Sequence, residues 1–228
     1  MAYGFEIKTA DGKEFLGINE ETYMYWGKAL IFENASPIHP FNIPISVDIE
    51  VYYYCNEENV YMEKGVHLGN HSLTLYREDG GVNTAIAYAY IFMKPTDIAV
   101  EGYGLALYKE DSTLQWHSAR PPLSFSHLVS GLSTTKDSSI TTGTLSAVRL
   151  MALGFEGVPL GGNQTELWSR RLAASSVGGV HTVSVVGEFR STEDVASLPS
   201  YNPIGPLLYL GCIDTAYFDS ISNKGNWA

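Results

Sequence analysis

The chain has 228 residues, of which 45% are hydrophobic, 12% aromatic and only 17% charged, a composition that supports a folded core and excludes a disordered chain. Its 15 tyrosines, with Val, Ile, Thr and Phe, favour strands, because these side chains suit half-buried pleated surfaces. A formal net charge of -11 argues against binding to nucleic acid or to anionic lipid, which need clustered Lys and Arg.

The acidity lies mainly in the first half of the chain. Residues 1–100 carry 6 basic against 14 acidic side chains, and residues 101–228 carry 8 against 11. Solubility explains this excess, and a cation or a basic partner is the alternative. The N-terminus has neither a basic segment nor an apolar run typical of a signal peptide, so we expect synthesis in a cytoplasm.

The two cysteines, Cys55 and Cys212, are far apart in the sequence. Neither has a second Cys or a His at the spacing of a zinc site, and both have apolar neighbours. The sequence therefore favours buried, reduced thiols over a disulfide.

The chain begins with a predicted β-hairpin. Phe5 and Ile7 alternate with charged residues, which is the period of two of a strand with one buried face. Residues 10–13 contain Asp-Gly, a turn signal, and residues 14–16 resume the apolar pattern. Similar patterns predict two more hairpins and further strands: 73–81 with 84–92, 103–112 with 114–116, and strands at 45–54, 180–189 and 207–218.

Helical patterns are scarce. Residues 144–153 fit a short helix or a buried strand about equally well. Residues 191–196 come nearest to a capped helix start, but Pro199 leaves room for about two turns. The sequence therefore predicts an all-β protein with little helix, built from hairpins.

One segment of the chain is nearly repeated after one hundred residues. Residues 103–112 echo residues 3–12, and the turn at 95–97 directly precedes the second copy. We place a domain boundary there and predict two sandwich-like or barrel-like β domains, 1–96 and 97–228. The echo fits either a true duplication or two hairpins that share the same turn chemistry.

Motifs that carry chemistry are weak in this sequence. His67 and His71 lie four apart, but Gly69 and Asn70 between them indicate a turn instead of a metal-binding helix face. The sequence contains no Gly-x-Ser-x-Gly motif of a serine hydrolase. The acidic pairs at 57–58 and 78–79 are typical of solvated turns, and only a set separation across a cleft would suit them to glycoside hydrolysis. The glycine-rich segment 154–162 lacks the Lys-Ser/Thr of a phosphate-binding loop. We predict no catalytic, cofactor-binding or metal-ligating residue, and no enzymatic activity.

The tyrosines permit two interpretations. Tyr52, Tyr53, Tyr54, Tyr61, Tyr88 and Tyr90 can form a stacking platform for sugars. Alternate residues of a strand face opposite sides, however, so only some of them can share a face. We favour sheet tyrosines with one end buried or packed at a subunit contact, where aromatic residues are enriched.

The two copies of the echo also carry a family resemblance. Residues 1–4 with the strand and Asp-Gly turn that follow, and residues 103–116 with Ser118, resemble the openings of small β-rich virion proteins of tailed bacteriophages. Two positions depart from the pattern: His117 stands where Asp is usual, and Ser112 replaces the turn glycine. The resemblance covers about thirty residues in total and is partly hairpin chemistry.

The resemblance implies a structural component of a phage particle, in the tail, tail tip or neck, located in the virion and made in the bacterial cytoplasm. Its partners would be other virion proteins and further copies of itself around a symmetry axis, with neither nucleic acid nor membrane. A capsid decoration protein is one alternative, and a carbohydrate-binding module that recognises host glycan through tyrosines is another. We expect loops at 34–44, 118–143 and 154–165 to dock on neighbours.

Overall fold

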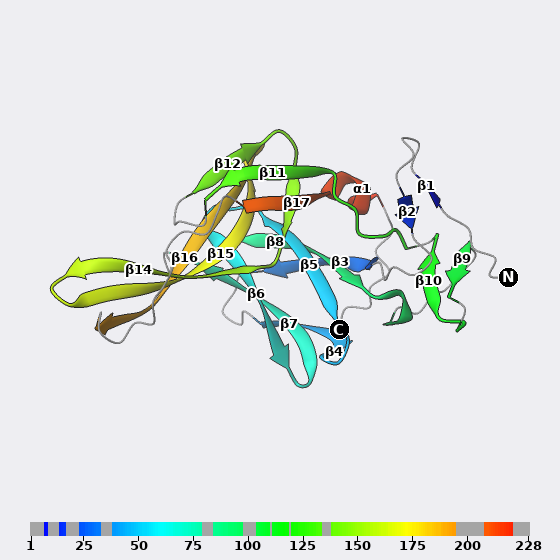
Figure 1. The fold of residues 1–228 in the computed structure, drawn as a ribbon, viewed down its shortest axis with the longest axis horizontal. Helices are drawn as coiled ribbons and strands as arrows, with labels where there is room; N and C mark the ends of the chain where they lie inside the picture. The colour runs from blue at the N-terminus through cyan, green and yellow to red at the C-terminus, as the bar shows by residue number, and fades with distance from the viewer. Residues whose placement is uncertain are drawn as a thin grey trace.

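The structure is a computed structural model that describes residues 7–8, 14–16, 23–32, 38–78, 84–97, 104–109, 111–118, 120–133, 138–194 and 208–220. Most of these residues lie in strands, as the sequence predicted (Figure 1). The strands are β1 (Ile7–Lys8), β2 (Glu14–Leu16), β3 (Met24–Phe32), β4 (Ile38–Pro44), β5 (Ile49–Cys55), β6 (Val60–His67), β7 (Asn70–Arg77), β8 (Ile86–Met93), β9 (Ala106–Tyr108), β10 (Leu114–His117), β11 (His127–Leu132), β12 (Ser139–Thr142), β13 (Ser146–Arg149), β14 (Ala152–Gly161), β15 (Gln164–Val177), β16 (Val180–Asp194) and β17 (Leu208–Asp214). The helical elements are η1 (Pro95–Asp97) and α1 (Thr215–Asp219), and no helix in the described ranges has the length and apolar character of a membrane span.

A ten-stranded sheet curls into a nearly closed, barrel-like body (Figure 1). Its main path runs β11-β17-β13-β5-β15-β16-β12, and β8 and β3 extend it from the other edge of β5. β5 pairs with β8 along its whole length on one side and shares the other side between β13 and β15. Central strands covered on both faces read as continuous apolar runs, which explains the sequence Ile-Glu-Val-Tyr-Tyr-Tyr-Cys of β5.

A second sheet of three strands, β4-β7-β6, packs beside the barrel. The link is Tyr53 of β5, which is fully buried. Its hydroxyl donates to the carbonyl of Leu172 in β15 at 2.6 Å and accepts from the amide of Met62 in β6 at 3.3 Å. One tyrosine therefore joins three strands from two sheets.

Most of the buried apolar residues that the structure describes form one cluster. It contains residues from both sides of residue 96, among them Phe92 of β8, Val185 of β16 and Phe218 of α1. The boundary between 1–96 and 97–228 stays a prediction, but strands from both sides of it share one sheet and one core.

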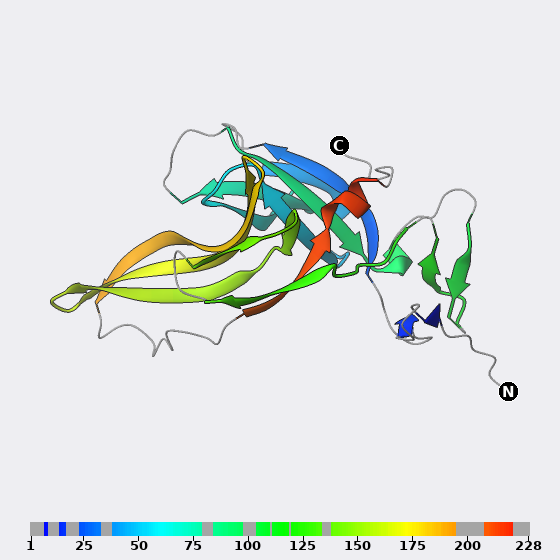
Figure 2. The same cartoon turned by 90° about the horizontal axis from the view of Figure 1, so that it is seen from above.

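The echo in the sequence corresponds to two small hairpins. β1 pairs with β2, and β9 pairs with β10. Ile7 lies opposite Leu16 in the first hairpin and Leu107 lies opposite Trp116 in the second, so the register is the same after an offset of one hundred residues. Both hairpins lie at the same end of the molecule (Figures 1 and 2), and the first turn lies outside the described residues.

Several predicted elements are wrong. The segments 34–44, 118–143 and 154–165 are not simply loops, since they contain β4, β11, β12 and most of β14. β7 and β8 are strands as expected, but they lie in different sheets and do not pair. Residues 191–194 continue β16 instead of starting a helix, and the strand predicted at 207–218 ends at Asp214, after which α1 begins.

The ambiguous segment at 144–153 resolves as strand. It holds β13 and the start of β14. Ser146, Ala147 and Val148 are all buried, as expected for a strand that is covered on both faces.

Candidate functional site

One serine and histidine pair has the geometry of a nucleophile and its base. The Oγ of Ser146 lies 2.9 Å from Nε2 of His127, whose Nδ1 lies 2.9 Å from the Oγ of Ser126. Sequence reasoning missed this pair because Ser146 and His127 belong to different strands, β13 and β11. Ser146 is only 3% exposed and also contacts the carbonyl of Thr144 at 2.9 Å. The hydroxyl is therefore closed to substrate, and the network ties two strands together.

The histidines of the predicted turn lie as expected. β6 ends at His67, residues 68–69 form the turn with positive φ angles, and β7 follows. His71 is buried, and its Nε2 lies 2.7 Å from the carbonyl oxygen of Val47. This contact fixes the β6-β7 hairpin against the start of β5.

The tyrosines considered as a sugar platform lie in the core. Tyr52, Tyr53, Tyr54, Tyr61 and Tyr90 are all buried, while Tyr88 is half-buried. The ring of Tyr88 stacks on that of Tyr54 with centroids 4.8 Å apart. The Nζ of Lys28 lies 4.5 Å from the centroid of the Tyr88 ring. The platform interpretation is wrong for the five buried rings, and burial in the sheet is the correct one.

Both cysteines are buried free thiols, as predicted. Burial raises the pKa of Cys55 and of Cys212 to about 11. Such thiols are protonated at neutral pH and are poor nucleophiles or metal ligands. The cysteines therefore contribute packing.

The most prominent surface feature is a projecting arm, which we define as β14 with residues 164–171 of β15 and 186–194 of β16. Both views show it extending beyond the barrel (Figures 1 and 2). Among the described strands β14 pairs only with β15, so its outer edge has no backbone partner there. An unpaired edge of this length is a template for a further strand.

The root of the arm is pinned by a buried cation. Arg170 is 2% exposed, and its guanidinium carbon lies 5.7 Å from the ring centroid of Trp168. Gly187 on β16 leaves the space for it, because a Cβ there would lie 1.9 Å from Nη1 of Arg170. The arm is thus fixed to the barrel at its base.

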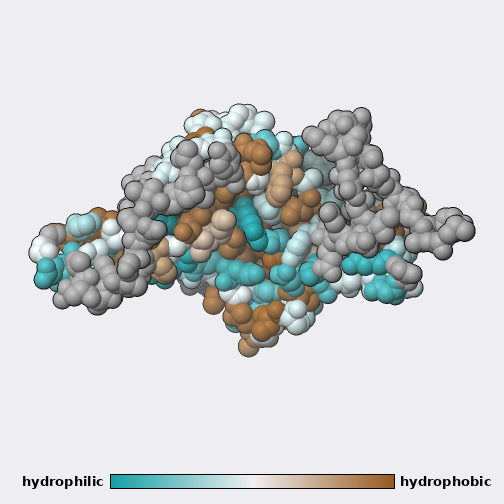
Figure 3. Space-filling view, viewed as in Figure 1, coloured by the Kyte–Doolittle hydropathy of each residue, from teal (hydrophilic) through white to brown (hydrophobic). Residues whose placement is uncertain are grey.

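The outer part of the arm exposes apolar side chains. Phe155 is 50% exposed and Leu160 is 52% exposed, both on β14. A second exposed apolar group lies at the β6-β7 turn, where Figure 3 shows brown atoms at the lower end of the molecule. It consists of Ile45, Val66 and Leu68, of which Leu68 is 88% exposed. Exposed apolar groups of this kind mark interaction surfaces.

A groove lies where the arm leaves the barrel. It comprises a cavity of about 380 Å³ and an adjoining one of about 210 Å³, which share Lys64, Leu150 and Ala152 in their walls. Buried apolar residues of β5 and β6, including Val51 and Met62, form its floor. A cavity of this size lies in the range of binding pockets.

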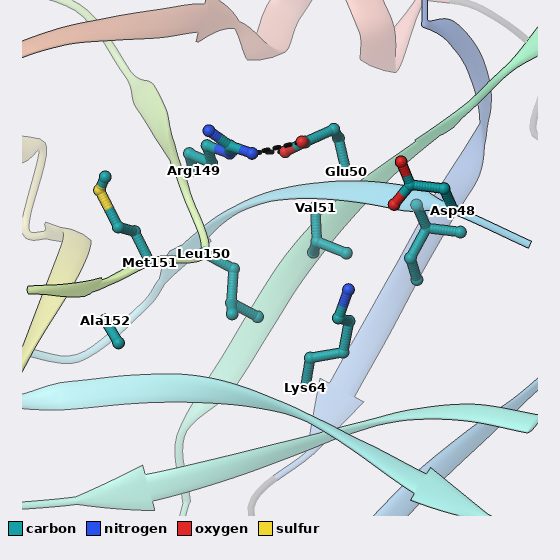
Figure 4. Close-up of a pocket in the computed structure, with 9 residues that line it drawn as sticks. Asp48, Glu50, Val51, Lys64, Arg149, Leu150, Met151 and Ala152 are labelled. Atoms are coloured by element: carbon teal, nitrogen blue, oxygen red, sulfur yellow. Dashed lines mark hydrogen bonds and ion pairs between the residues drawn. The ribbon is translucent and has the colours of Figure 1, made fainter. Parts of the chain in front are cut away.

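Charged side chains surround this groove. Arg149 forms a bidentate ion pair with Glu50, and its Nε lies 2.6 Å from the carboxylate (Figure 4). This hydrogen bond to Glu50 raises the pKa of Arg149. On the other side, Nε of Arg171 donates to Glu63 at 2.9 Å. Two cations are therefore held in place by two carboxylates.

Lys64 stands between these two ion pairs. Its side chain points into the groove from β6 (Figure 4), and within the described part of the chain it has neither a hydrogen bond nor an ion pair. The opposite rim holds Asp48, which accepts a hydrogen bond from the hydroxyl of Tyr23 and thereby raises the pKa of that tyrosine to about 12. Lys64 is therefore a cation without a partner among the described residues of the groove.

Comparison with protein-family models, with curated protein sequences and with solved structures finds no match to this chain.

Proposed function

We propose that this protein is a structural component of a tailed-bacteriophage virion, a tail, tail-tip or neck accessory protein that acts by assembling with other proteins. The arm is the observation that carries this proposal. It presents a strand edge with no partner among the described strands, together with exposed Phe155 and Leu160, and such a surface is stabilised by a partner.

The residues of the family resemblance support the proposal through their roles in the β9-β10 hairpin. A Cβ at Gly104 would lie 2.5 Å from the ring of His117, so glycine permits the close approach. The hydroxyl of Ser118 accepts from the amide of Leu105 at 2.9 Å, and the amide of Ser118 donates to the carbonyl of Leu105 at 2.8 Å. These contacts close the β9-β10 hairpin, and the β1-β2 pair has the same register one hundred residues earlier.

Particle fractionation tests the proposal. Phage particles from a lysate are purified on a density gradient and separated into heads and tails, and peptides of this chain are quantified by mass spectrometry. We expect a constant number of copies per particle in the tail fraction. Recovery in the head fraction would instead favour a capsid decoration protein. Absence from intact particles, with the chain present in the cleared lysate, would contradict a virion role.

A further inference from the structure

We propose that the β6-β7 hairpin of one copy pairs edge to edge with the same hairpin of a second copy, so that the protein forms a two-fold symmetric dimer. In this dimer the two β6 strands run antiparallel and join the two β4-β7-β6 sheets into one. Leu68 at the tip of each hairpin enters the groove of the other copy. The inference goes beyond the proposed function, because it concerns a surface and a partner that a virion role does not require.

The outer edge of β6 carries backbone groups that can accept a further strand. Among the described strands β6 pairs only with β7, without a bulge. The amide of Met62 donates to the hydroxyl of Tyr53 at 3.3 Å, so the backbone of Met62 faces away from β7. Because this direction alternates along an antiparallel strand, the amides and carbonyls of Lys64 and Val66 face outward as well. They have no hydrogen-bond partner in the described part of the chain.

A second copy of β6 satisfies all of these groups in one register. When Lys64 lies opposite Val66 of the partner subunit, the two-fold axis passes between the two Gly65 residues. Both equivalent pairs then exchange their amide and carbonyl hydrogen bonds. A shift in one direction would place the two Lys64 side chains opposite each other, and a shift in the other would pair Lys64 with the turn. The edge therefore complements itself in this register.

The tip of the hairpin is an exposed leucine in a turn that disfavours it. Leu68 is 88% exposed, and the φ angles of Leu68 and Gly69 are 49° and 81°. A two-residue turn with both φ angles positive favours Asn-Gly, because most side chains are strained there. The amide of Ile45 donates to the carbonyl of Gly69 at 3.1 Å and fixes the tip in place. Within the described part of one copy, Leu68 thus gains little from burial and costs turn strain.

The register brings this leucine to the groove. Leu68 of the partner subunit lies opposite Met62, just beyond the last hydrogen-bonded pair. The cavity of about 210 Å³ at this point has Met62 and Leu150 in its wall. Its charged residues Glu63 and Arg171 are already paired with each other, with Nε and Oε1 2.9 Å apart. An apolar side chain therefore suits the cavity better than a charged one, and a leucine supplies it.

The side chains along the two edges agree with the same register. His67 of the partner subunit lies opposite Glu63, in a pair without backbone hydrogen bonds, where side chains approach most closely. The contacts of Glu63 with two arginines all use its Oε1 atom, so Oε2 can accept from the imidazole. Val66 is 63% exposed, and the alkyl chain of the opposite Lys64 covers it.

The two-fold axis closes the dimer, because each copy uses its edge and its tip once. The contact is smaller than the interface of a permanent dimer, so we expect a dissociation constant in the micromolar range. Sedimentation velocity of the full chain should show monomer at low concentration, dimer at high concentration and no larger species.

Leu68→Asn separates docking from folding. It should weaken the dimer by about tenfold or more, because both grooves lose an apolar side chain. The same change should leave the urea midpoint of the monomer unchanged or raise it, since asparagine is favoured at this turn position. A misfolded variant would instead lose stability together with the dimer.

Val66→Pro tests the strand pairing itself. Proline removes the outward amide of residue 66 and takes no hydrogen bond away from β7, so an edge strand tolerates it. We expect this variant to keep the circular dichroism spectrum of the unmodified protein and to stay monomeric. Val66→Thr is the matched control, because it keeps the amide and the side-chain shape, and it should dimerise normally.

Gly65→Cys tests the register. Residues of a pair without backbone hydrogen bonds have Cα atoms about 4.5 Å apart, which is within the reach of a disulfide. A Cβ at Gly65 would lie 3.0 Å from the hydroxyl oxygen of Ser72, a side chain that can turn away. Oxidised glutathione should link this variant into covalent dimers. Leu128→Cys, at a 70% exposed position on β11, should stay unlinked.

A monomeric unmodified protein at every concentration would overturn the inference, as would a Leu68→Asn or Val66→Pro variant that dimerises as tightly as the unmodified protein. Failure of Gly65→Cys to link a dimer would refute the register and the inference with it. Particle fractionation separates the two proposals. A chain found in virions but monomeric in solution refutes only the dimer, and a dimer of a chain absent from particles refutes only the virion role.

Discussion

At the scale of single residues, Ser112 departs from the sequence pattern of the hairpin and has a strained backbone conformation. It occupies the turn position where the related pattern has glycine, and its φ angle is 68°. A side chain in this left-handed region costs roughly 1–2 kcal/mol, which glycine avoids. The neighbouring Asp111 accepts from the amide of Thr113 at 2.9 Å and holds the turn in this conformation. The β9-β10 hairpin therefore carries local strain.

Ser112→Gly should stabilise this hairpin by about 0.5–1 kcal/mol, since the lost strain exceeds the added flexibility of the unfolded chain. Hydrogen exchange at the Lys109 amide, which donates to the carbonyl of Thr113 at 2.8 Å, measures the change. We expect slower exchange in Ser112→Gly and no gain in Ser112→Ala, which retains a Cβ. Equal exchange rates in all three proteins would show that the turn is unstrained.

At the scale of elements, local patterns predicted structure well and pairing poorly. The β9-β10 hairpin was predicted correctly because one short turn specifies both strands. Residues 73–81 and 84–92 read equally well as a hairpin, but β7 pairs with β4 and β6 while β8 pairs with β3 and β5. Partners distant in sequence decided the outcome, and a local pattern does not contain them.

The groove could not be predicted for the same reason. Lys64, Arg149 and Arg171 are isolated charges in the sequence, and only the packing of β6 beside the end of β13 and the middle of β15 brings them together. The arm was equally hidden, because residues 154–162 are rich in glycine and resemble a loop. Because β14 pairs on one side only among the described strands, it tolerates these glycines and Pro159.

A mixed contact adds to the packing of Phe218 in attaching the short helix α1 to the barrel. Nζ of Lys28 lies 2.6 Å from Oδ1 of Asp219, to which the hydroxyl of Tyr90 also donates at 2.9 Å. The two ion-pair side chains are 21% and 36% exposed, so solvent weakens their attraction. Nζ also lies 4.5 Å from the ring centroid of Tyr88, which adds a cation-π contribution.

Replacing this cation should lower the stability of the fold. We expect Lys28→Met to reduce the free energy of unfolding by about 1 kcal/mol, measured by urea denaturation followed by circular dichroism. Lys64→Met is the matched control, because Lys64 is exposed and has no partner among the residues that the structure describes. This variant should unfold at the same urea concentration as the unmodified protein. Similar midpoints for Lys28→Met and the control would refute the role of the contact.

At the scale of the whole molecule, the shared core makes stability sensitive to alkaline pH. Burial raises the pKa of Tyr52 and of Tyr54 to about 12, and that of both thiols to about 11. Because these pKa values are higher in the folded state, their contribution is complete below the unfolded values. This contribution to the free energy of unfolding decreases as pH rises, first because the thiols of the unfolded chain ionise and then because its tyrosines ionise.

Urea denaturation across the pH range measures this loss. The free energy of unfolding should begin to fall near pH 9, the ordinary pKa of the thiols, and fall more steeply above pH 10 as unfolded tyrosines ionise. Cys55→Ala combined with Cys212→Ala should remove the first part of this slope and leave the second. A constant free energy up to pH 11 would contradict the burial of these groups.

Assembly through the arm is the claim on which the proposed function depends. A variant in which Asn-Gly replaces residues 157–167 shortens the arm with a tight hairpin turn, between the paired residues Glu156 and Trp168. Its barrel core should keep the circular dichroism spectrum of the unmodified protein. Both proteins are expressed together during phage infection, and their ratio in purified particles is measured by mass spectrometry. We expect the shortened protein to be excluded from the particles, whereas incorporation of the two proteins in proportion to their expression would contradict assembly through the arm.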